Sequence, residues 1–197
     1  KRQEIVKTRF GTSDSAKGKG IEKLSKQILA GAMRSYVESE YENLFETHQC
    51  RPHAYGHTWS PGFELQSGLL HGHAVSIGMG LGAFLSWQRG WINQETLTRI
   101  ADLISSFELS LWHEILLDEE LIWTAQTSVT DKRGGKLAAP VPKGEIGNCG
   151  YLNDVSREQL REGIIGYKSF CANYPRSGVG LEPVSYTHLR AHETHEN

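Results

Sequence analysis

The sequence predicts a mainly α-helical domain with one small β-hairpin. Apolar residues recur at helical spacing from Ile21 onward, and a 19-residue apolar segment at residues 69–87, LLHGHAVSIGMGLGAFLSW, is typical of a helix buried on most sides. Only residues 131–154 change to a Gly- and Pro-containing composition that favours a hairpin. Strands that alternate with helices, as a parallel sheet requires, are missing from the pattern.

The first predicted helix covers about residues 21–44 and follows a polar segment with little periodicity. Its apolar side chains fall near one stripe of a 3.6-residue repeat, so we expect this stripe to face inward. The stripe consists of Ile21, Leu24, Ile28, Ala32 and Val37. Residues 46–70 are dense in His, Gly, Pro and aromatic residues, which predicts a loop with a short helix. The apolar helix at residues 69–87 comes next, and Gly90 is typical of the residue that closes such a helix.

Three further helices are marked by their capping residues. Asn93 or Gln94 opens one, Asp118 precedes the acidic first turn of another, and Ser156 caps the last. The inward positions expected in the first and last of these helices are Leu97, Ile100, Ala101, Leu103 and Ile104, and Leu160, Ile164, Ile165 and Phe170.

The hairpin is expected between the second and third of these helices. Residues 131–135, DKRGG, predict its turn, and residues 136–142, KLAAPVP, predict an edge strand because proline cannot donate to a central ladder. Gly144, Gly147 and Gly150 break up the returning segment.

The composition argues against several classes of protein. With 21 basic and 23 acidic residues, the formal net charge is −2, which provides no long-range attraction for nucleic acid or anionic lipid. The mean hydropathy of −0.44 argues against a membrane protein. The three cysteines are widely spaced and form no CxxC pair, so neither a disulfide framework nor a cysteine zinc site is expected. This cysteine usage indicates a reducing compartment, and without a signal peptide we expect the cytoplasm.

Three parts of the chain are distinguished. Residues 1–17 form a loosely patterned leading segment, residues 18–183 the helical domain, and residues 184–197 a tail that contains three histidines. Within the tail, SYTHLRAHET resembles one reading frame of a common sequencing adapter, so we expect these histidines to carry no chemistry. We therefore expect the natural protein to extend beyond both ends of this sequence.

Four histidines lie close together in the sequence, namely His53, His57, His71 and His73. Neutral imidazole is the commonest protein ligand for zinc, and a loop histidine and one at a helix start can converge on one ion. Hydrogen-bonded core or capping histidines are the alternative, because no HExxH-type spacing is present. Glu64 is the only carboxylate between His57 and His71 that offers a third ligand.

Other motifs predict structure more than chemistry. Residues 78–83, GMGLGA, match the GxGxxG/A dinucleotide pattern, but they sit inside an apolar helix and favour close helix packing instead. Arg34, Arg51 and Lys143 are isolated basic residues, which are usually solvated surface charges. Tyr55 and Trp59 favour packing over a stacking role.

Two segments together carry a resemblance to a known family. RPHAYGHTWSP at residues 51–61 and LHGHAVSIGM at residues 70–79 resemble the sugar-phosphate cyclase superfamily, the family of 3-dehydroquinate synthase. Ser60-Pro61 and the HGH triplet are more similar to the branch that acts on sedoheptulose 7-phosphate, of the demethyl-4-deoxygadusol or 2-epi-5-epi-valiolone type. The resemblance covers about residues 18–180 and implies the C-terminal helical domain of a dehydroquinate synthase-like fold. The N-terminal α/β nucleotide-binding domain of that fold is not matched here.

The resemblance implies roles for four residues. His57 and His71 match the two histidine ligands of the family's Zn²⁺ or Co²⁺, and the family's third ligand is a glutamate from an earlier stretch. Arg34 falls where the family has a substrate-contacting lysine, and Lys143 falls near another. No catalytic residue is assigned, and NAD would bind the N-terminal domain, so we expect no cofactor-binding residue in this fragment.

Three positions depart from 3-dehydroquinate synthase. Pro61 replaces its second histidine, His73 its glutamate and Ala54 its asparagine. The resemblance therefore favours a cyclase of the demethyl-4-deoxygadusol type, a lyase of mycosporine-type biosynthesis, over the valiolone type and 3-dehydroquinate synthase. It implies a sugar phosphate as substrate and a homodimer, with no nucleic-acid or membrane partner. The fragment alone is expected to be inactive, and a non-catalytic helical interaction module is the alternative of another class.

Overall fold

The structure, a computed structural model, describes residues 19–43, 48 and 50–175. The leading segment 1–17 and the tail 184–197 lie outside the described residues. Within the described part of the chain, no helix is both long enough and apolar enough to cross a bilayer.

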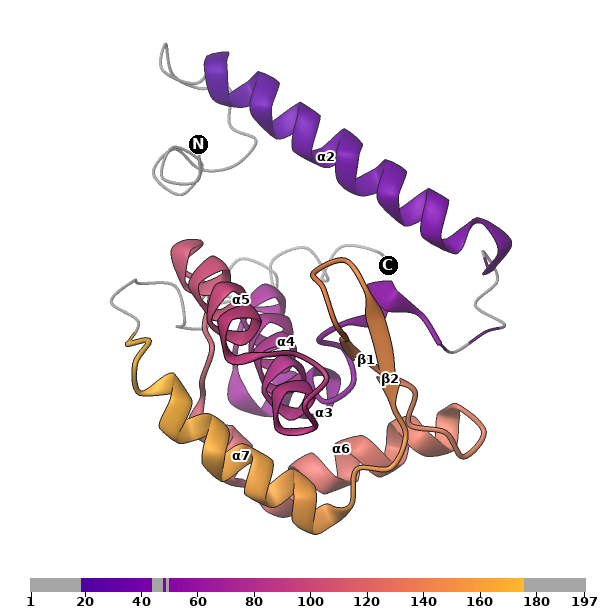
Figure 1. Ribbon diagram of the computed structural model, residues 1–197, viewed down its shortest axis with the longest axis vertical. Coiled ribbons are helices and arrows are strands. Elements are labelled where there is room, and N and C mark those ends of the chain that lie inside the picture. The colour runs from indigo at the N-terminus through magenta and orange to yellow at the C-terminus, as the bar shows by residue number, and fades with distance from the viewer. Residues whose placement is uncertain (1–18, 44–47, 49, 176–197) are drawn as a thin grey trace, which may run out of the picture.

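A single helix, α4 (His71–Gln88), forms the centre of the domain. It contacts α3 (Ser60–Ser67), α5 (Gln94–Ser106), α7 (Arg157–Cys171) and strand β1 (Ala139–Pro142). Figure 1 shows α4 between α5 and the hairpin, with α7 and α6 (Glu119–Lys132) along the lower edge of the domain. This arrangement confirms the predicted mainly helical domain with one hairpin, and it explains why α4 is apolar on nearly every side.

The glycines of the GMGLGA segment allow neighbouring segments to approach α4 closely. A Cβ added at Gly78 would lie 2.2 Å from the carbonyl oxygen of Gly56, and one at Gly80 would lie 1.9 Å from the hydroxyl of Tyr167. Because these distances exclude any side chain, the close-packing interpretation of the segment is confirmed. Among the described residues, no strand leads into the motif, as the dinucleotide-binding pattern would require.

The predicted helix starts are confirmed by their caps. The side chains of Asn93 and Asp118 accept hydrogen bonds from the backbone N–H groups of Thr96 and Leu121. Ser156 forms a capping box with Gln159, which satisfies two backbone donors at once. The positive φ of +69° at Gly90 likewise confirms where α4 ends.

The position of the hairpin turn was predicted wrongly. Asp131 and Lys132 are the last residues of α6, and the turn lies instead at residues 143–148, between β1 and β2 (Cys149–Leu152). The strands pair antiparallel with Ala139 opposite Leu152 and Pro142 opposite Cys149. The predicted edge strand 136–142 therefore begins only at Ala139. Its first residues are held by side chains instead, because Arg133 donates to the carbonyls of Leu137 and Ala138.

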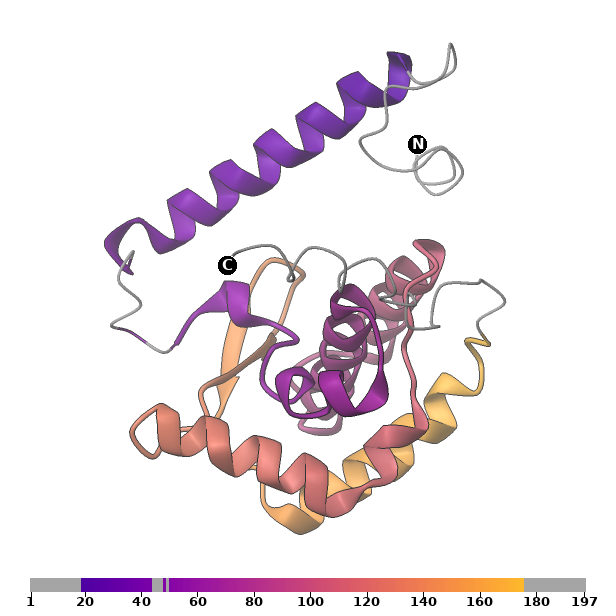
Figure 2. The same cartoon turned by 180° about the vertical axis from the view of Figure 1, so that it is seen from behind.

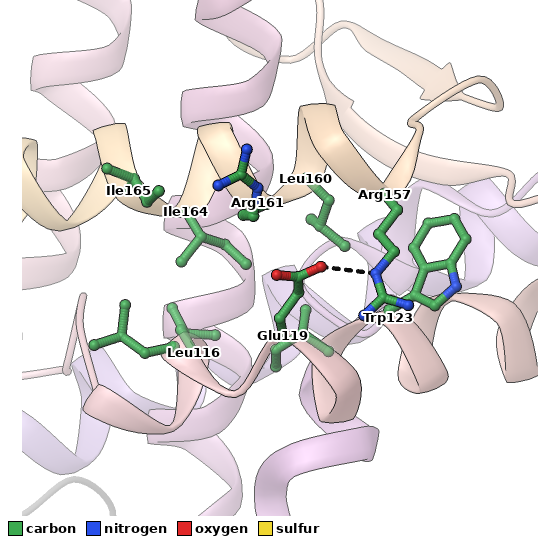
Figure 3. Close-up of a pocket in the computed structure, with 10 residues that line it drawn as sticks. Leu116, Glu119, Trp123, Arg157, Leu160, Arg161, Ile164 and Ile165 are labelled. Atoms are coloured by element: carbon green, nitrogen blue, oxygen red, sulfur yellow. Dashed lines mark hydrogen bonds and ion pairs between the residues drawn. The ribbon is translucent and has the colours of Figure 1, made fainter.

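Two positions predicted to face the core are exposed. Leu103 on α5 is 47% exposed and Ile165 on α7 is 53% exposed. Consecutive helical residues point about 100° apart, so each of these side chains turns away from the buried stripe beside it. Ile165 lies on the rim of a small apolar hollow between α6 and α7, where Arg157 donates to Glu119 across 2.7 Å (Figure 3).

Helix α2 (Lys19–Glu40) differs from the others because most of its predicted inward stripe is open to solvent, with only Leu24 half-buried among the described side chains of the stripe. The helix is confirmed, but it ends at Glu40 and continues only as the short 3-10 turn η1 (Tyr41–Asn43). Ile28 and Val37 are 41% and 49% exposed, and Ala32 is exposed as well. Figures 1 and 2 show α2 standing apart from the domain along most of its length. The prediction that its stripe faces inward is therefore wrong for these positions, and the side chain of Ile21 lies outside the described set.

Candidate metal centre

His57 is held in a tight turn against α4. The turn follows the 3-10 segment η2 (Pro52–Ala54), and the His57 N–H donates to the carbonyl of Ala54 at 2.9 Å. The preceding residue, Gly56, has φ of +87°, and a Cβ there would lie 2.7 Å from the Val75 carbonyl oxygen. Only glycine meets both requirements, so Gly56 sets the backbone position from which the His57 side chain extends.

His71 reaches the same place from the start of α4. Helix α3 ends at Gly68, whose φ of +68° reverses the chain, and the Ser67 hydroxyl accepts from the Leu69 N–H at 3.2 Å. The short connection then places His71 as the first residue of α4, with its side chain 64% exposed.

The two imidazole rings lie side by side. Their centroids are 5.4 Å apart and the ring planes are inclined by 53°. A tetrahedral ion about 2 Å from one nitrogen of each ring requires ring centres roughly this far apart. The structure thus brings together the two predicted metal ligands, which are separated by a whole helix in the sequence.

In both rings, Nδ1 is the nitrogen that has a hydrogen-bond partner. His57 Nδ1 lies 3.3 Å from the backbone carbonyl oxygen of Tyr55, and His71 Nδ1 lies 2.9 Å from Oε2 of Glu64. A carbonyl and a carboxylate oxygen can only accept, so in the neutral rings the proton belongs on Nδ1. Within the described residues, neither Nε2 is hydrogen-bonded, and each keeps a lone pair that can bind a metal.

The donor set fits part of a zinc or cobalt centre. Two imidazole nitrogens are suitable ligands for these ions, but a catalytic centre normally takes three protein ligands. Among the residues that the structure describes, no three His, Cys, Asp or Glu side chains gather as a metal-binding group. The glutamate expected from an earlier stretch therefore stays a prediction.

The other histidines of the cluster serve the structure. His73 is only 9% exposed, and its Nδ1 accepts from the backbone N–H of Ser110 at 3.2 Å. The His53 ring lies against the Tyr36 ring, with centroids 5.1 Å apart. Hydrogen-bonded or packed histidine, the alternative left open by the sequence, thus describes His53 and His73. His57 and His71 are hydrogen-bonded only through Nδ1 among the described residues, and their role as metal ligands stays a prediction.

The structure does not bring Lys143 to the histidine pair. Its Nζ lies 4.5 Å from the centre of the Trp91 ring, just beyond the C-terminal end of α4. His71 is at the opposite end of this 18-residue helix, which is about 27 Å long. Arg34 is exposed on α2. Substrate contact by Arg34 and Lys143 stays a prediction.

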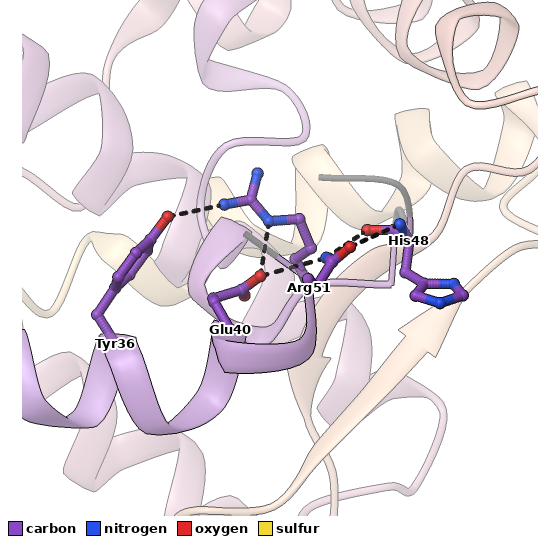
Figure 4. Close-up of polar contacts among 5 residues, drawn as sticks. Tyr36, Glu40, His48 and Arg51 are labelled. Carbon is purple, nitrogen blue, oxygen red and sulfur yellow. Dashed lines mark hydrogen bonds and ion pairs between the residues drawn. The ribbon is translucent and has the colours of Figure 1, made fainter. Parts of the chain in front are cut away.

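Sequence reasoning missed the role of Arg51. Its Nε donates to Oε2 of Glu40 at 3.1 Å and its Nη2 donates to the Tyr36 hydroxyl at 3.2 Å (Figure 4). Glu40 is 3% exposed, so this is a largely buried ion pair and not the solvated charge predicted. It ties the end of α2 to the segment that leads into His57. No local pattern signals it, because the partners come from separate elements.

The aromatic residues near the site pack as predicted. The hydroxyl of Tyr55 donates to the carbonyl of Met79 at 2.7 Å, and burial raises the pKa of this phenol far above its usual range. Trp59 is 1% exposed, and its Nε1 donates to Gln126 at 3.1 Å. The Trp59 ring is thus enclosed, and the Tyr55 hydroxyl is bound to the backbone of α4.

Comparison with known proteins identifies the family. Residues 12–133 match the family described as 3-dehydroquinate synthase C-terminal. The chain belongs to this family. The resemblance seen in the sequence is thereby confirmed for the sugar-phosphate cyclases as a group, and with it the expected fold.

Similar proteins come from more than one cyclase branch. The chain is 37% identical to demethyl-4-deoxygadusol synthase of Trichormus variabilis, over 91% of this chain and 43% of that protein. It is 31% identical to 2-epi-5-epi-valiolone synthase of Streptomyces albus, over 73% of this chain and 35% of that protein. The chain thus spans less than half the length of the relatives it matches.

A solved structure has the same fold. It is 2-epi-5-epi-valiolone synthase from Streptomyces hygroscopicus subsp. jinggangensis, which was solved with NAD⁺ and Zn²⁺ bound. The TM-score is 0.71 at 24% identity, with 86% of this chain and 46% of that chain covered.

Proposed function

We propose that this cyclase chain is the metal- and substrate-binding part of an enzyme that converts sedoheptulose 7-phosphate to 2-demethyl-4-deoxygadusol. The observation that carries the proposal is the facing pair His57 and His71, each with its Nε2 lone pair open. The identity to demethyl-4-deoxygadusol synthase over most of this chain supports the choice of branch. The departures at Ala54, Pro61 and His73 argue against 3-dehydroquinate synthase itself.

The proposed reaction transfers hydride from a secondary alcohol of the sugar phosphate to NAD⁺, eliminates phosphate, and then opens and recloses the ring by an aldol step with loss of water. The product is the substrate without phosphate and water, so the hydride returns from NADH and there is no net oxidation. When bound, zinc or cobalt would supply Lewis acidity at the sugar oxygen where negative charge collects, and NAD would supply the hydride acceptor. NAD is expected in a nucleotide-binding domain outside this sequence. The bound NAD⁺ and Zn²⁺ of the solved valiolone synthase support both cofactors.

The residues of this chain bind and orient in this proposal. His57 and His71 hold the ion from two directions, because one imidazole comes from a turn and the other from a helix start. The turn at Gly56 and the helix corner at Gly68 fix both attachment points, so little ordering is needed when the ion binds. Arg34 is proposed to balance substrate phosphate charge. The whole enzyme is proposed to be a cytoplasmic homodimer.

The test uses the natural full-length protein that contains this sequence, supplied with sedoheptulose 7-phosphate, NAD and zinc. Mass spectrometry should detect 2-demethyl-4-deoxygadusol. His57→Ala and His71→Ala should each lose most of the bound metal and turnover, whereas His48→Ala, a control with an exposed side chain, should keep both. Residues 1–183 alone should bind zinc weakly and show no turnover.

A different product would assign the protein to another branch of the cyclases. Formation of 2-epi-5-epi-valiolone would move the protein to the sister branch, and 3-dehydroquinate formed from its own substrate would move it to the third. A full-length protein without metal and without any cyclised product would leave the helical interaction module as the remaining function.

A further inference from the structure

The two facing histidines are held by different kinds of acceptor. His57 Nδ1 faces a backbone carbonyl, which every sequence possesses, whereas His71 Nδ1 faces the side chain of Glu64 at 2.9 Å. The orientation of the His71 ring therefore depends on the identity of the residue at position 64. Glu64 is seven positions away and lies on another helix, α3.

The Glu64 carboxylate is attached to a rigid support. Its neighbour Phe63 is completely buried, and a Cβ at Gly62 would lie 2.2 Å from the Ala125 Cβ of α6, so α3 packs directly on α6. The Ser67 hydroxyl donates to the Glu64 carbonyl at 2.9 Å and closes the corner between α3 and α4. With its side chain 26% exposed, Glu64 is the more enclosed partner, and His71 at 64% is the more open one.

We propose that Glu64 is a positioning residue for the metal ligand His71. Its carboxylate accepts the Nδ1–H of the imidazole, holds the ring in the Nδ1–H tautomer and leaves Nε2 facing the ion shared with His57. Carboxylates that orient metal-bound histidines in this way affect metal affinity about 10–100-fold. The proposal rests on the proposed metal centre. In it, Glu64 orients a metal ligand and is not a ligand itself.

The position of Glu64 separates this role from direct ligation. Its Oε2 already accepts from Nδ1 of His71, and not from the Nε2 that is left for the ion, so the carboxylate lies on the Nδ1 side of the ring. A third ligand would have to approach the Nε2 atoms instead. The sequence alone left Glu64 as a candidate ligand, and the observed hydrogen bond favours the positioning role.

The first experiment determines the tautomer of His71 in the metal-free protein. The full-length protein is labelled with ¹⁵N-histidine, stripped of metal and examined by long-range ¹H–¹⁵N NMR at a pH where the rings are neutral. His71 should be the Nδ1–H tautomer in the unaltered protein and in Glu64→Gln, whose amide oxygen still accepts. In Glu64→Ala it should shift to the Nε2–H form, while Glu145→Gln, an exposed control in the hairpin turn, should change nothing. An unaltered protein with Nε2–H at His71, or a tautomer indifferent to Glu64→Ala, would overturn the proposal.

The second experiment measures zinc dissociation constants by chelator competition, with circular dichroism to show that each variant is folded. Glu64→Ala should weaken binding about 10–100-fold and Glu64→Gln less, with His71→Ala weakest of all. Equal loss in Glu64→Ala and His71→Ala would make Glu64 a ligand, and unchanged affinity in Glu64→Ala would remove its role; either result overturns the proposal. Unchanged zinc affinity in His71→Ala would refute the proposed metal centre instead. The tautomer measurement would then still show whether Glu64 orients the His71 ring.

Discussion

The two ends of α4 have opposite characters. At the C-terminal end, polar groups are paired within the protein: Ser86 donates to the carbonyl of Pro142, Arg89 pairs with Asp154 at 2.6 Å, and Lys143 lies over Trp91. At the N-terminal end, two imidazole rings lie side by side, and among the described residues Nε2 of each has no hydrogen-bond partner. Polar atoms without a protein partner thus mark the candidate metal site, whereas the polar atoms at the other end are paired and serve the fold.

The largest effect is expected from a change that damages both the fold and the candidate metal site. Gly78→Ala places a methyl group against the Gly56 carbonyl, which is backbone and cannot rotate away. We expect the free energy of unfolding to fall by about 3 kcal/mol, near the upper end for overpacking. Zinc affinity should fall as well, because Gly56 precedes His57. Urea unfolding and zinc titration measure the two quantities.

Gly72→Ala is the matched control on the same helix. A Cβ at Gly72 meets nothing within 4 Å, so the substitution should leave stability unchanged or raise it by up to about 1 kcal/mol through helix propensity. If Gly72→Ala and Gly78→Ala destabilised equally, close contact with Gly56 would not be the cause.

The second largest effect is a loss of stability that should be confined to the C-terminal end of α4. Ser86→Ala removes the buried hydroxyl that donates to the Pro142 carbonyl and leaves a partly buried acceptor without its partner. We expect a loss of about 1–2 kcal/mol in unfolding free energy with unchanged zinc affinity. A large change in zinc affinity in a folded Ser86→Ala protein would show that the two ends are coupled.

A smaller effect is expected at Lys143. Lys143→Ala removes the ammonium 4.5 Å from the Trp91 ring centre and should cost about 0.5–1 kcal/mol. The measurement is thermal unfolding, with Trp91→Leu in a double-mutant cycle as the control for the ring. Alongside it, the KM for the sugar phosphate tests the predicted substrate contact, because a large rise in KM would place Lys143 in the site in spite of its distance from His71.

The smallest effect concerns pH. The hydrogen bond from Arg89 holds the pKa of Asp154 below its ordinary value of 3.8. A lowered carboxyl pKa stabilises the fold above the ordinary value, and this contribution is lost as the pH falls through the folded-state value below 3.8. Arg89→Gln should flatten this part of the stability–pH curve slightly, because Asp154 is 74% exposed and well screened. Added salt should reduce the difference between the two proteins, and a difference that grows with salt would contradict the assignment.

Much of the fold follows from local sequence signals. Asn93, Asp118 and Ser156 each set a helix start through a hydrogen bond to a residue three positions ahead, and the apolar α4 with its glycines could only be a buried helix. The hairpin turn was misplaced because DKRGG is as compatible with a helix end as with a strand turn, and the contact of Arg133 with the Leu137 carbonyl decides between them.

The candidate site was only half predictable. His57 and His71 were found from the motifs around them, and the family match at residues 12–133 includes both. Burial of His73, the Glu40–Arg51 pair and the distance of Lys143 from the site were not found, because each depends on where another element lies.

Local patterns were sufficient to predict most of the helices, their caps, the close packing of the α4 glycines and the family, because these depend on residues that are neighbours in the chain or on a motif. Tertiary structure alone decided which nitrogen of each imidazole stays open and which carboxylate stands behind His71. The reason is physical: a hydrogen bond between α3 and α4 exists only once the corner at Gly68 has turned, and no local propensity encodes the direction in which a ring then points.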